Sequence, residues 1–210
     1  MLNQNDRDRV REAVIRAEAG LAAEIVPCVF AQSSPYPEAA WAGGAAAGGL
    51  ACAALFLTDL VHPLWLPLSI LILLVPAVAL AGAALGHWFR PVKRFLIGSR
   101  RMEESAARRA KEVFFDHGVA RTKARDGVLV FASLLERRAI VLADESLRAK
   151  MGPEKWRPAV SALAAAADDG RVADGLIAAI EAVAEALRAA GAVGKGGGEL
   201  PVDALEEDAR

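Results

Sequence analysis

The stretch GVLVFASLLERRAIVLAD, residues 127–144, contains two apolar runs on either side of a short polar turn. Residues 127–133 and residues 138–143 are rich in Val, Ile, Leu and Ala, and runs of this length and composition are typical of buried strands. A parallel pair of strands would need a crossover of about a dozen residues, and the turn is far shorter. The stretch therefore predicts an antiparallel hairpin within a buried sheet.

Amphipathic helices are predicted before and after this hairpin. Residues 104–116 place Val113 and Phe114 on an apolar face, opposite a cationic one. Residues 153–167 and 172–190 are Ala-rich and are separated by an Asp-Asp-Gly break. Because each segment has an apolar face to bury, these helices are expected to pack against the sheet.

A further strand is expected near the N-terminus, at residues 24–31. The run EIVPCVFA is short, apolar and contains several β-branched residues. Pro27 cannot donate a ladder hydrogen bond, which favours a sheet edge or a bulge at this position. Helices on both sides of a small mixed sheet place the chain in the α/β class.

Two long segments between these strands contain no charged residue. Residues 39–58 are rich in Ala and Gly, and residues 64–88 are rich in Leu, Ile and Val. Each has the roughly 20 apolar residues that cross a bilayer as a helix. Neither has the polar stripe of a surface helix. The two segments predict a transmembrane helical hairpin over residues 38–90.

Aromatic and cationic residues mark the ends of these predicted spans. Trp41, Trp65 and Trp88 fall at span ends, where indole rings prefer the headgroup layer. The connector between the spans has no Lys or Arg, whereas cations crowd the exit of the second span: Arg90, Lys93, Arg94, Arg100 and Arg101. The positive-inside rule then predicts a multi-pass protein of a bacterial inner membrane with both termini in the cytoplasm. The same cations are candidates for contact with anionic headgroups.

Small residues within the spans allow two interpretations. Gly44 and Gly48 form one small-xxx-small pair, and Gly82 and Gly86 form another. Such spacing lets helix backbones approach closely, either inside the hairpin or between copies in a homo-oligomer. The ionisable residues of this region lie at the span edges rather than at mid-depth, which argues against a transporter.

The composition excludes several classes of protein. Apolar residues make up 54% of the 210 residues, which rules out a wholly disordered chain. The formal net charge is −1, so no basic face for nucleic acid is expected. Cys28 and Cys52 are too few for a disulfide scaffold or a zinc site.

The order of the segments predicts a discontinuous domain. One strand precedes the spans and the others follow them, so residues 1–37 and 91–192 are expected to form a single α/β domain with the hairpin of residues 38–90 inserted. Residues 193–210 are Gly-rich and then mostly acidic. They are expected to form a flexible or peripherally docked C-terminal tail.

Several segments resemble the TPM domain family. They are RAEAGLAAEIV at Arg16–Val26, the hairpin stretch at residues 127–144, Trp156, and GELPVDALEED at Gly198–Asp208. The hairpin stretch is the most specific of them. The family includes thylakoid-lumen photosystem II repair proteins, an acetylcholine-receptor modulator and many bacterial membrane proteins. The chain is most similar to the bacterial subgroup that has a membrane hairpin inside the domain.

The resemblance implies a three-layer α/β/α sandwich. It also implies that acid phosphatase activity and divalent-cation binding occur in some members, and repair or receptor-assembly roles in others. Relatives tend to have Thr-Ser-Gly where this chain has Leu21-Ala22-Ala23. Any role of those hydroxyl groups is therefore absent here.

Acidic residues at one end of the predicted hairpin are candidates for a metal site. Asp126 precedes the first strand, and Asp144 and Glu145 follow the second, so antiparallel pairing brings them to the same end. Carboxylate oxygens are ligands that Ca²⁺ and Mg²⁺ prefer. Solvated turn acids are the alternative interpretation, and Glu136 falls at the opposite end of the hairpin. No other cofactor is expected.

A phosphatase nucleophile is not recognisable in the sequence. Ser34, rather than Arg, stands six residues after Cys28, so the cysteine-phosphatase loop is missing. A triad of Ser133, His117 and Asp116 is a further alternative for nucleophilic catalysis.

These observations favour an interaction module over an enzyme. The predicted function is that of a membrane-anchored accessory protein at the cytoplasmic face, which assists assembly or turnover of a membrane-protein partner. A membrane-tethered, divalent-cation-dependent phosphatase is the alternative. The expected partners are the lipid bilayer, a membrane protein and a second copy of the chain, but no nucleic acid.

Overall fold

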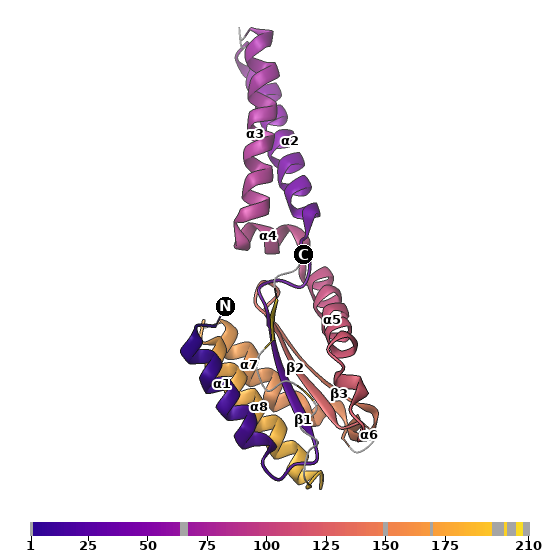
Figure 1. Cartoon of the computed structure of the whole chain (residues 1–210). Helices are drawn as coiled ribbons and strands as arrows, with labels where there is room; N and C mark the ends of the chain where they lie inside the picture. The colour runs from indigo at the N-terminus through magenta and orange to yellow at the C-terminus, as the bar shows by residue number, and fades with distance from the viewer. Residues whose placement is uncertain are drawn as a thin grey trace. The chain divides into compact units, whose positions relative to one another are not determined.

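The computed structural model describes residues 2–63, 67–148, 151–168, 170–194, 200 and 205–207. The chain divides into two compact units (Figure 1). Residues 1–34 and 103–210 form the α/β unit, and residues 35–102 form the hairpin unit. Residues 35–37 and 91–102, which were predicted to lie in the α/β domain, thus belong to the hairpin unit.

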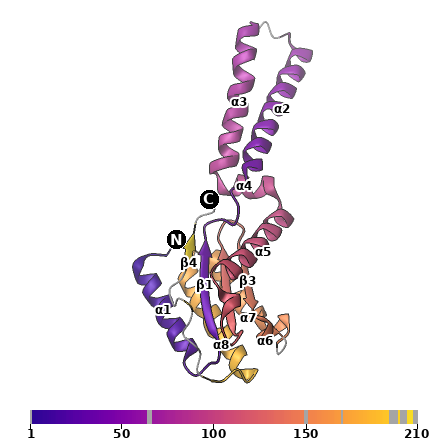
Figure 2. The same ribbon diagram turned by 45° about the vertical axis from the view of Figure 1, so that its right-hand side comes forward.

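The α/β unit is built on a small mixed sheet in the order β3-β2-β1-β4. Strands β1 (Glu24–Phe30) and β2 (Gly127–Ser133) run parallel along their whole length. Strand β3 (Arg138–Ala143) returns antiparallel to β2, and β4 (Leu205–Glu207) pairs parallel with the end of β1 (Figure 2). The predicted mixed α/β class and the antiparallel hairpin are confirmed. Strand β4 was not predicted and lies in the segment assigned to the tail.

Strand β1 is fully buried and lies between β2 and β4, and no bulge is found at Pro27; the expected sheet edge holds only locally, at Pro27 itself. Pro27 stands opposite Val130 of β2 in a continuous register. On its other side, β4 pairs with β1 only from Cys28 to Phe30. Among the described residues, Pro27 therefore lies where β1 has a single neighbouring strand. A residue without an N–H group is tolerated there because no β4 carbonyl stands opposite it.

Helices pack on both faces of this sheet. On one face, α1 (Gln4–Glu18), α7 (Arg157–Asp168) and α8 (Val172–Ala189) enclose an apolar core with alternate strand residues such as Val128 and Val130. Figure 1 shows α1 and α8 next to each other on one side of β1.

The other face of the sheet is covered by α5 (Ser99–Asp116), which was predicted as residues 104–116. Its Val113 and Phe114 pack against Leu129 and Phe131 of β2. Shorter elements connect the main ones: η1 (Val119–Arg121), α6 (Glu145–Arg148) and η2 (Pro153–Trp156). Alternate side chains of β2 thus contribute to the apolar cores on the two faces of the sheet.

The hairpin unit contains α2 (Pro37–Val61), α3 (Leu68–Trp88) and α4 (Arg90–Ile97). Glycines set the contact between α2 and α3. A Cβ atom at Gly43 would lie 2.4 Å from the Gly82 carbonyl oxygen, and one at Gly86 would lie 2.3 Å from the Ala39 carbonyl oxygen. The backbones therefore touch, which supports the predicted packing of small residues inside the hairpin. Helix α4 was not predicted as a separate element.

Candidate functional site

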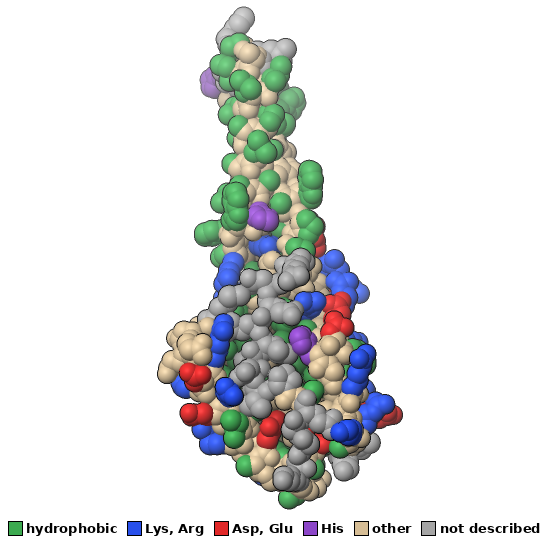
Figure 3. Space-filling model, viewed as in Figure 1, with side chains coloured by type: hydrophobic (Ala, Val, Ile, Leu, Met, Phe, Trp, Pro, Cys, Tyr) green, Lys and Arg blue, Asp and Glu red, His purple; other side chains and the backbone are tan. Residues whose placement is uncertain are grey.

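The exposed apolar surface of α2 and α3 is the most distinctive feature of the described chain. Both helices are long and apolar enough to cross a membrane. Only 6% of the apolar window in α2 and 11% of that in α3 is buried. Figure 3 shows hydrophobic side chains distributed along these helices. A helix in the core of a globular protein would be mostly buried, so these two helices need a partner or a lipid environment for their outer faces.

Aromatic side chains stand at the base of the helical pair. Trp41 is 80% exposed and Trp88 is 77% exposed, while Trp65 lies outside the described residues. Phe95 of α4 is 86% exposed. Large exposed aromatic rings at helix ends are typical of the boundary between hydrocarbon and headgroups.

The predicted cations lie in different environments. Arg90, Arg100 and Arg101 are exposed and Arg94 is half-buried. Lys93 is buried, with its Nζ 6.0 Å from the centre of the Tyr36 ring, in the range of a cation–π contact. Its charge therefore faces the interior of the hairpin unit, while the four arginines remain candidates for headgroup contact.

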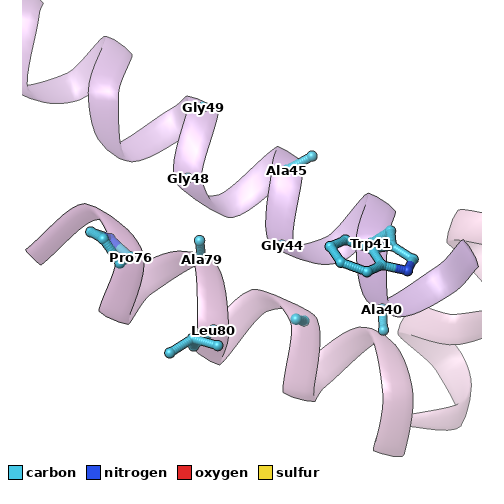
Figure 4. A pocket seen from close by; sticks show the side chains of 10 residues that line it. Ala40, Trp41, Gly44, Ala45, Gly48, Gly49, Pro76, Ala79 and Leu80 are labelled. Atoms are coloured by element: carbon cyan, nitrogen blue, oxygen red, sulfur yellow. The ribbon is translucent and has the colours of Figure 1, made fainter. Parts of the chain in front are cut away.

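An apolar groove of about 720 Å³ runs between α2 and α3 (Figure 4). Gly44, Gly48 and Ala79 form its small-residue walls, and Trp41 and Pro76 also line it. No charged side chain is among its lining residues. The groove offers shape but no chemical group for catalysis.

The candidate metal ligands lie where the sequence predicted, at one end of the β2–β3 hairpin. Asp126 and Asp144 are both buried, whereas Glu145 is exposed. An Asp144 Oδ1 atom accepts a hydrogen bond of 2.6 Å from the Glu145 backbone N–H, and the Arg125 guanidinium lies 3.8 Å away. The Asp144 carboxylate thus accepts from the first backbone N–H of α6.

The geometry at this end does not assemble a set of ligands. Within the described ranges, no three His, Cys, Asp or Glu side chains lie close enough together to hold a metal ion. The buried Oδ2 atom of Asp144 has no hydrogen-bond partner among the described residues. The metal site therefore stays a prediction from sequence.

The alternative triad of Ser133, His117 and Asp116 was wrong. His117 directly follows α5, and the segment after it packs against Gly127 at the start of β2, where a Cβ atom would meet the Val119 backbone. Ser133 is at the other end of β2. At about 3.3 Å per residue, the strand separates the two sites by about 20 Å.

Ser133 belongs instead to a buried polar cluster that was not predicted from the sequence. Glu136, which was interpreted as a solvated turn residue, is only 3% exposed. Its carboxylate accepts a 2.8 Å hydrogen bond from the Ser33 backbone N–H and another from the Ser133 hydroxyl. The Ser33 hydroxyl donates to the Ser133 oxygen at 2.7 Å. The cluster joins the end of β1 to the β2–β3 turn, and its hydrogen bonds are directed inward.

A half-buried carboxyl group is found at the opposite end of β1. Glu18 accepts a 2.7 Å hydrogen bond from the Ile25 backbone N–H. Burial raises the pKa of Glu18, and this effect outweighs the opposing influence of that hydrogen bond. The neighbouring charge of Glu24 acts in the same direction as burial. Glu18 thus joins α1 to β1 at some cost in desolvation.

Comparison with known proteins supports the fold and part of the family resemblance. Residues 94–186 match the family model of the TPM domain, from within α4 to near the end of α8. The chain is similar to the NMR structure of BA42 protein from the psychrophilic bacterium Bizionia argentinensis. The TM-score is 0.57 with 14% identity, over 99% of this chain and 96% of that one. At this identity the likeness concerns the fold alone. No curated protein matches the chain.

Proposed function

We propose that this protein is a membrane-anchored accessory module, in which α2 and α3 cross the bilayer and the α/β unit carries a binding surface for a membrane-protein partner. The observation that carries the proposal is the exposed apolar surface of the two helices. Leu57, Leu60 and Leu73 are 59%, 73% and 71% exposed, respectively. Exposure of such side chains to water along two whole helices would be strongly unfavourable, at about 25 cal/mol for each Å² of apolar surface.

The side of the membrane follows from the charges at the two ends of the helices. The described part of the connector, residues 59–63, contains Asp59 but no Lys or Arg. Arg90 and Arg94 stand in α4, directly after α3. Because short cationic flanks generally remain in the cytoplasm, these charges support our proposal that the α/β unit and both termini lie on the cytoplasmic side of a bacterial inner membrane.

An accessory role is supported by the chemistry of the described side chains. The buried cluster of Ser33, Ser133 and Glu136 is internally bonded, and Asp126, Asp144 and Glu145 do not form a ligand set. Neither the buried cluster nor the group of three acidic residues combines an accessible nucleophile with a base. The cation-dependent phosphatase remains the alternative proposal and would require phosphate release that depends on Asp144.

The test of anchoring is extraction of native membranes with alkaline carbonate, which removes peripheral proteins. The full chain is expected to stay in the membrane pellet. A double variant, Leu50→Arg with Leu80→Arg, changes exposed residues near the middle of α2 and α3 and is expected to move to the supernatant, because each charge near a span centre costs about 3 kcal/mol. Ile15→Arg, which changes an exposed residue of α1, is the matched control and should remain in the pellet. Wild-type protein in the supernatant would refute the proposal.

A further inference from the structure

A second groove, of about 650 Å³, lies within the α/β unit. It is lined by Val141 to Ala143 of β3, by Phe114 and Phe115 of α5, and by Trp156 of η2. Phe114 belongs to the core on one face of the sheet, and Trp156 belongs to the core on the other face. The groove is therefore not an internal cavity. It follows the outer edge of β3, between α5 and η2, which pack on opposite faces of the sheet.

Among the strands that the structure describes, β3 is the outermost on this side, so one row of its backbone groups faces away from β2. The Asp144 N–H donates a 2.9 Å hydrogen bond to the Gly127 carbonyl. This bond shows which alternate residues of β3 form hydrogen bonds with β2. Residues of an antiparallel strand alternate between bonding inward and pointing outward. The backbone N–H and C=O groups of Ala139, Val141 and Ala143 therefore do not bond to β2 and point outward, toward the groove.

The edge of β3 lacks the features that usually protect such strands. Its sequence RAIVLA contains no Pro, and its only charged residue is Arg138 at the first position. Its register with β2 is continuous, without a bulge. Exposed edges of this kind are templates for pairing with another extended segment.

The charges of the groove indicate the chemistry of that segment. Its charged lining residues are Lys111 and Arg148, which are both cationic and exposed. No acidic side chain is among the lining residues that the structure describes. A ligand with apolar residues and an acidic residue is complementary to this surface. A second copy pairing through β3 would instead bring the same cations toward each other, which is unfavourable.

We infer that the β3 groove binds an extended, acidic and apolar peptide segment of another protein, which adds as a new strand next to β3. The outward backbone groups of β3 would pair with the peptide backbone, and alternate apolar side chains of the peptide would pack against the aromatic residues of the groove. Lys111 and Arg148 would contact its acidic residues. The inference deepens the proposed function, because it names the surface that holds the partner.

The test starts from the full chain in lipid nanodiscs and a displayed library of random dodecapeptides as the probe. Selection is expected to enrich peptides that alternate apolar residues and contain Asp or Glu. A selected peptide should bind Val141→Pro at least about tenfold more weakly, since proline removes an outward donor and obstructs pairing. Val141→Thr keeps that donor and is the matched control, which should bind like wild type.

Two further measurements keep the inference falsifiable if Val141→Pro does not fold. The charge reversals Lys111→Glu and Arg148→Glu change exposed side chains and should each weaken binding about tenfold. In the wild-type protein, the peptide should slow hydrogen exchange at the amides of Ala139, Val141 and Ala143. The amides of Ile140 and Leu142, which already bond to β2, should change little.

The inference is overturned if no peptide is enriched, or if the selected peptides bind the charge-reversed proteins as tightly as wild type. It is also overturned if self-association that depends on β3 shows a second copy in the groove. A failure of membrane anchoring can be told apart from a failure of peptide binding, because carbonate extraction does not involve the groove. A chain that binds the peptide but is released by carbonate would refute the proposed anchoring alone.

Discussion

The buried carboxylate of Glu136 should be one of the most sensitive positions of the α/β unit. It accepts hydrogen bonds from the Ser33 backbone N–H and the Ser133 hydroxyl, and it is only 3% exposed. Hydrogen bonds to a charged group are worth about 1.5–3 kcal/mol each, and unpaired buried donors carry a desolvation penalty. Glu136→Ala is therefore expected to destabilise the α/β unit by about 4 kcal/mol. For a domain of this size, that corresponds to a fall of about 12 °C in Tm.

Glu136→Gln should have a much smaller effect. The glutamine carbonyl can still accept from the Ser33 N–H, and its amide group can donate to the Ser133 oxygen, so the hydrogen-bond chain reverses direction rather than breaking. The expected loss is about 1 kcal/mol. The contrast between the two substitutions separates the role of the hydrogen bonds from that of side-chain volume.

Cys28 provides the assay, because it is buried in the core of the α/β unit and reacts with a maleimide only when that core opens. The temperature at which half of Cys28 is labelled is measured for the full chain in membranes, in a Cys52→Ser background. Glu12→Ala, which removes an exposed carboxylate of α1, is the matched control and should shift this temperature little. A Glu136→Ala protein within about 1 kcal/mol of wild type would refute the reasoning.

Three other outcomes follow from the structure. Because the pKa of Glu18 is raised above its ordinary value of 4.5, its ionisation costs stability as the pH rises above that value. Glu18→Gln should therefore be more stable than wild type at neutral pH, with the difference disappearing below about pH 4 when thermal unfolding is followed by circular dichroism, which does not require a reactive thiolate. A Cβ atom at Gly44 would lie 3.3 Å from that of Ala83, so a Gly44→Cys, Ala83→Cys protein should form an intramolecular disulfide on oxidation, and its absence would contradict the packing of α2 on α3. Gly82→Val in that double-cysteine protein should reduce disulfide formation because a Cβ atom there would lie 2.5 Å from the Gly43 carbonyl oxygen, whereas Gly49→Val, with nothing within 4 Å, should not.

Local patterns were sufficient to predict the elements that dominate the structure. The composition of residues 127–144 indicated β2, the turn and β3, since a short polar turn permits only antiparallel pairing. The absence of charge over residues 39–58 and 64–88 indicated α2 and α3, because long apolar helices have a strong one-dimensional signal.

Features that depend on distant residues were missed. Strand β4 covers Leu205–Glu207 and is too short to carry a strand pattern of its own, so its pairing with β1 is decided by tertiary contact. Glu136 has the composition of a solvated turn, and its burial follows from the position of Ser33, 103 residues earlier. Lys93 was grouped with exposed cations, but the ring of Tyr36 lies beneath its ammonium group.

The central claim is that α2 and α3 lie in a bilayer, and the native Cys52 tests it most directly. Cys52 stands in the middle of α2 and is exposed on the protein surface. In native membranes, a membrane-impermeant maleimide should leave Cys52 unlabelled, because lipid excludes both the reagent and the thiolate form. Labelling should become complete after the bilayer and the fold are dissolved in SDS. Rapid labelling of Cys52 in intact membranes would show that the helix faces water and would contradict the account.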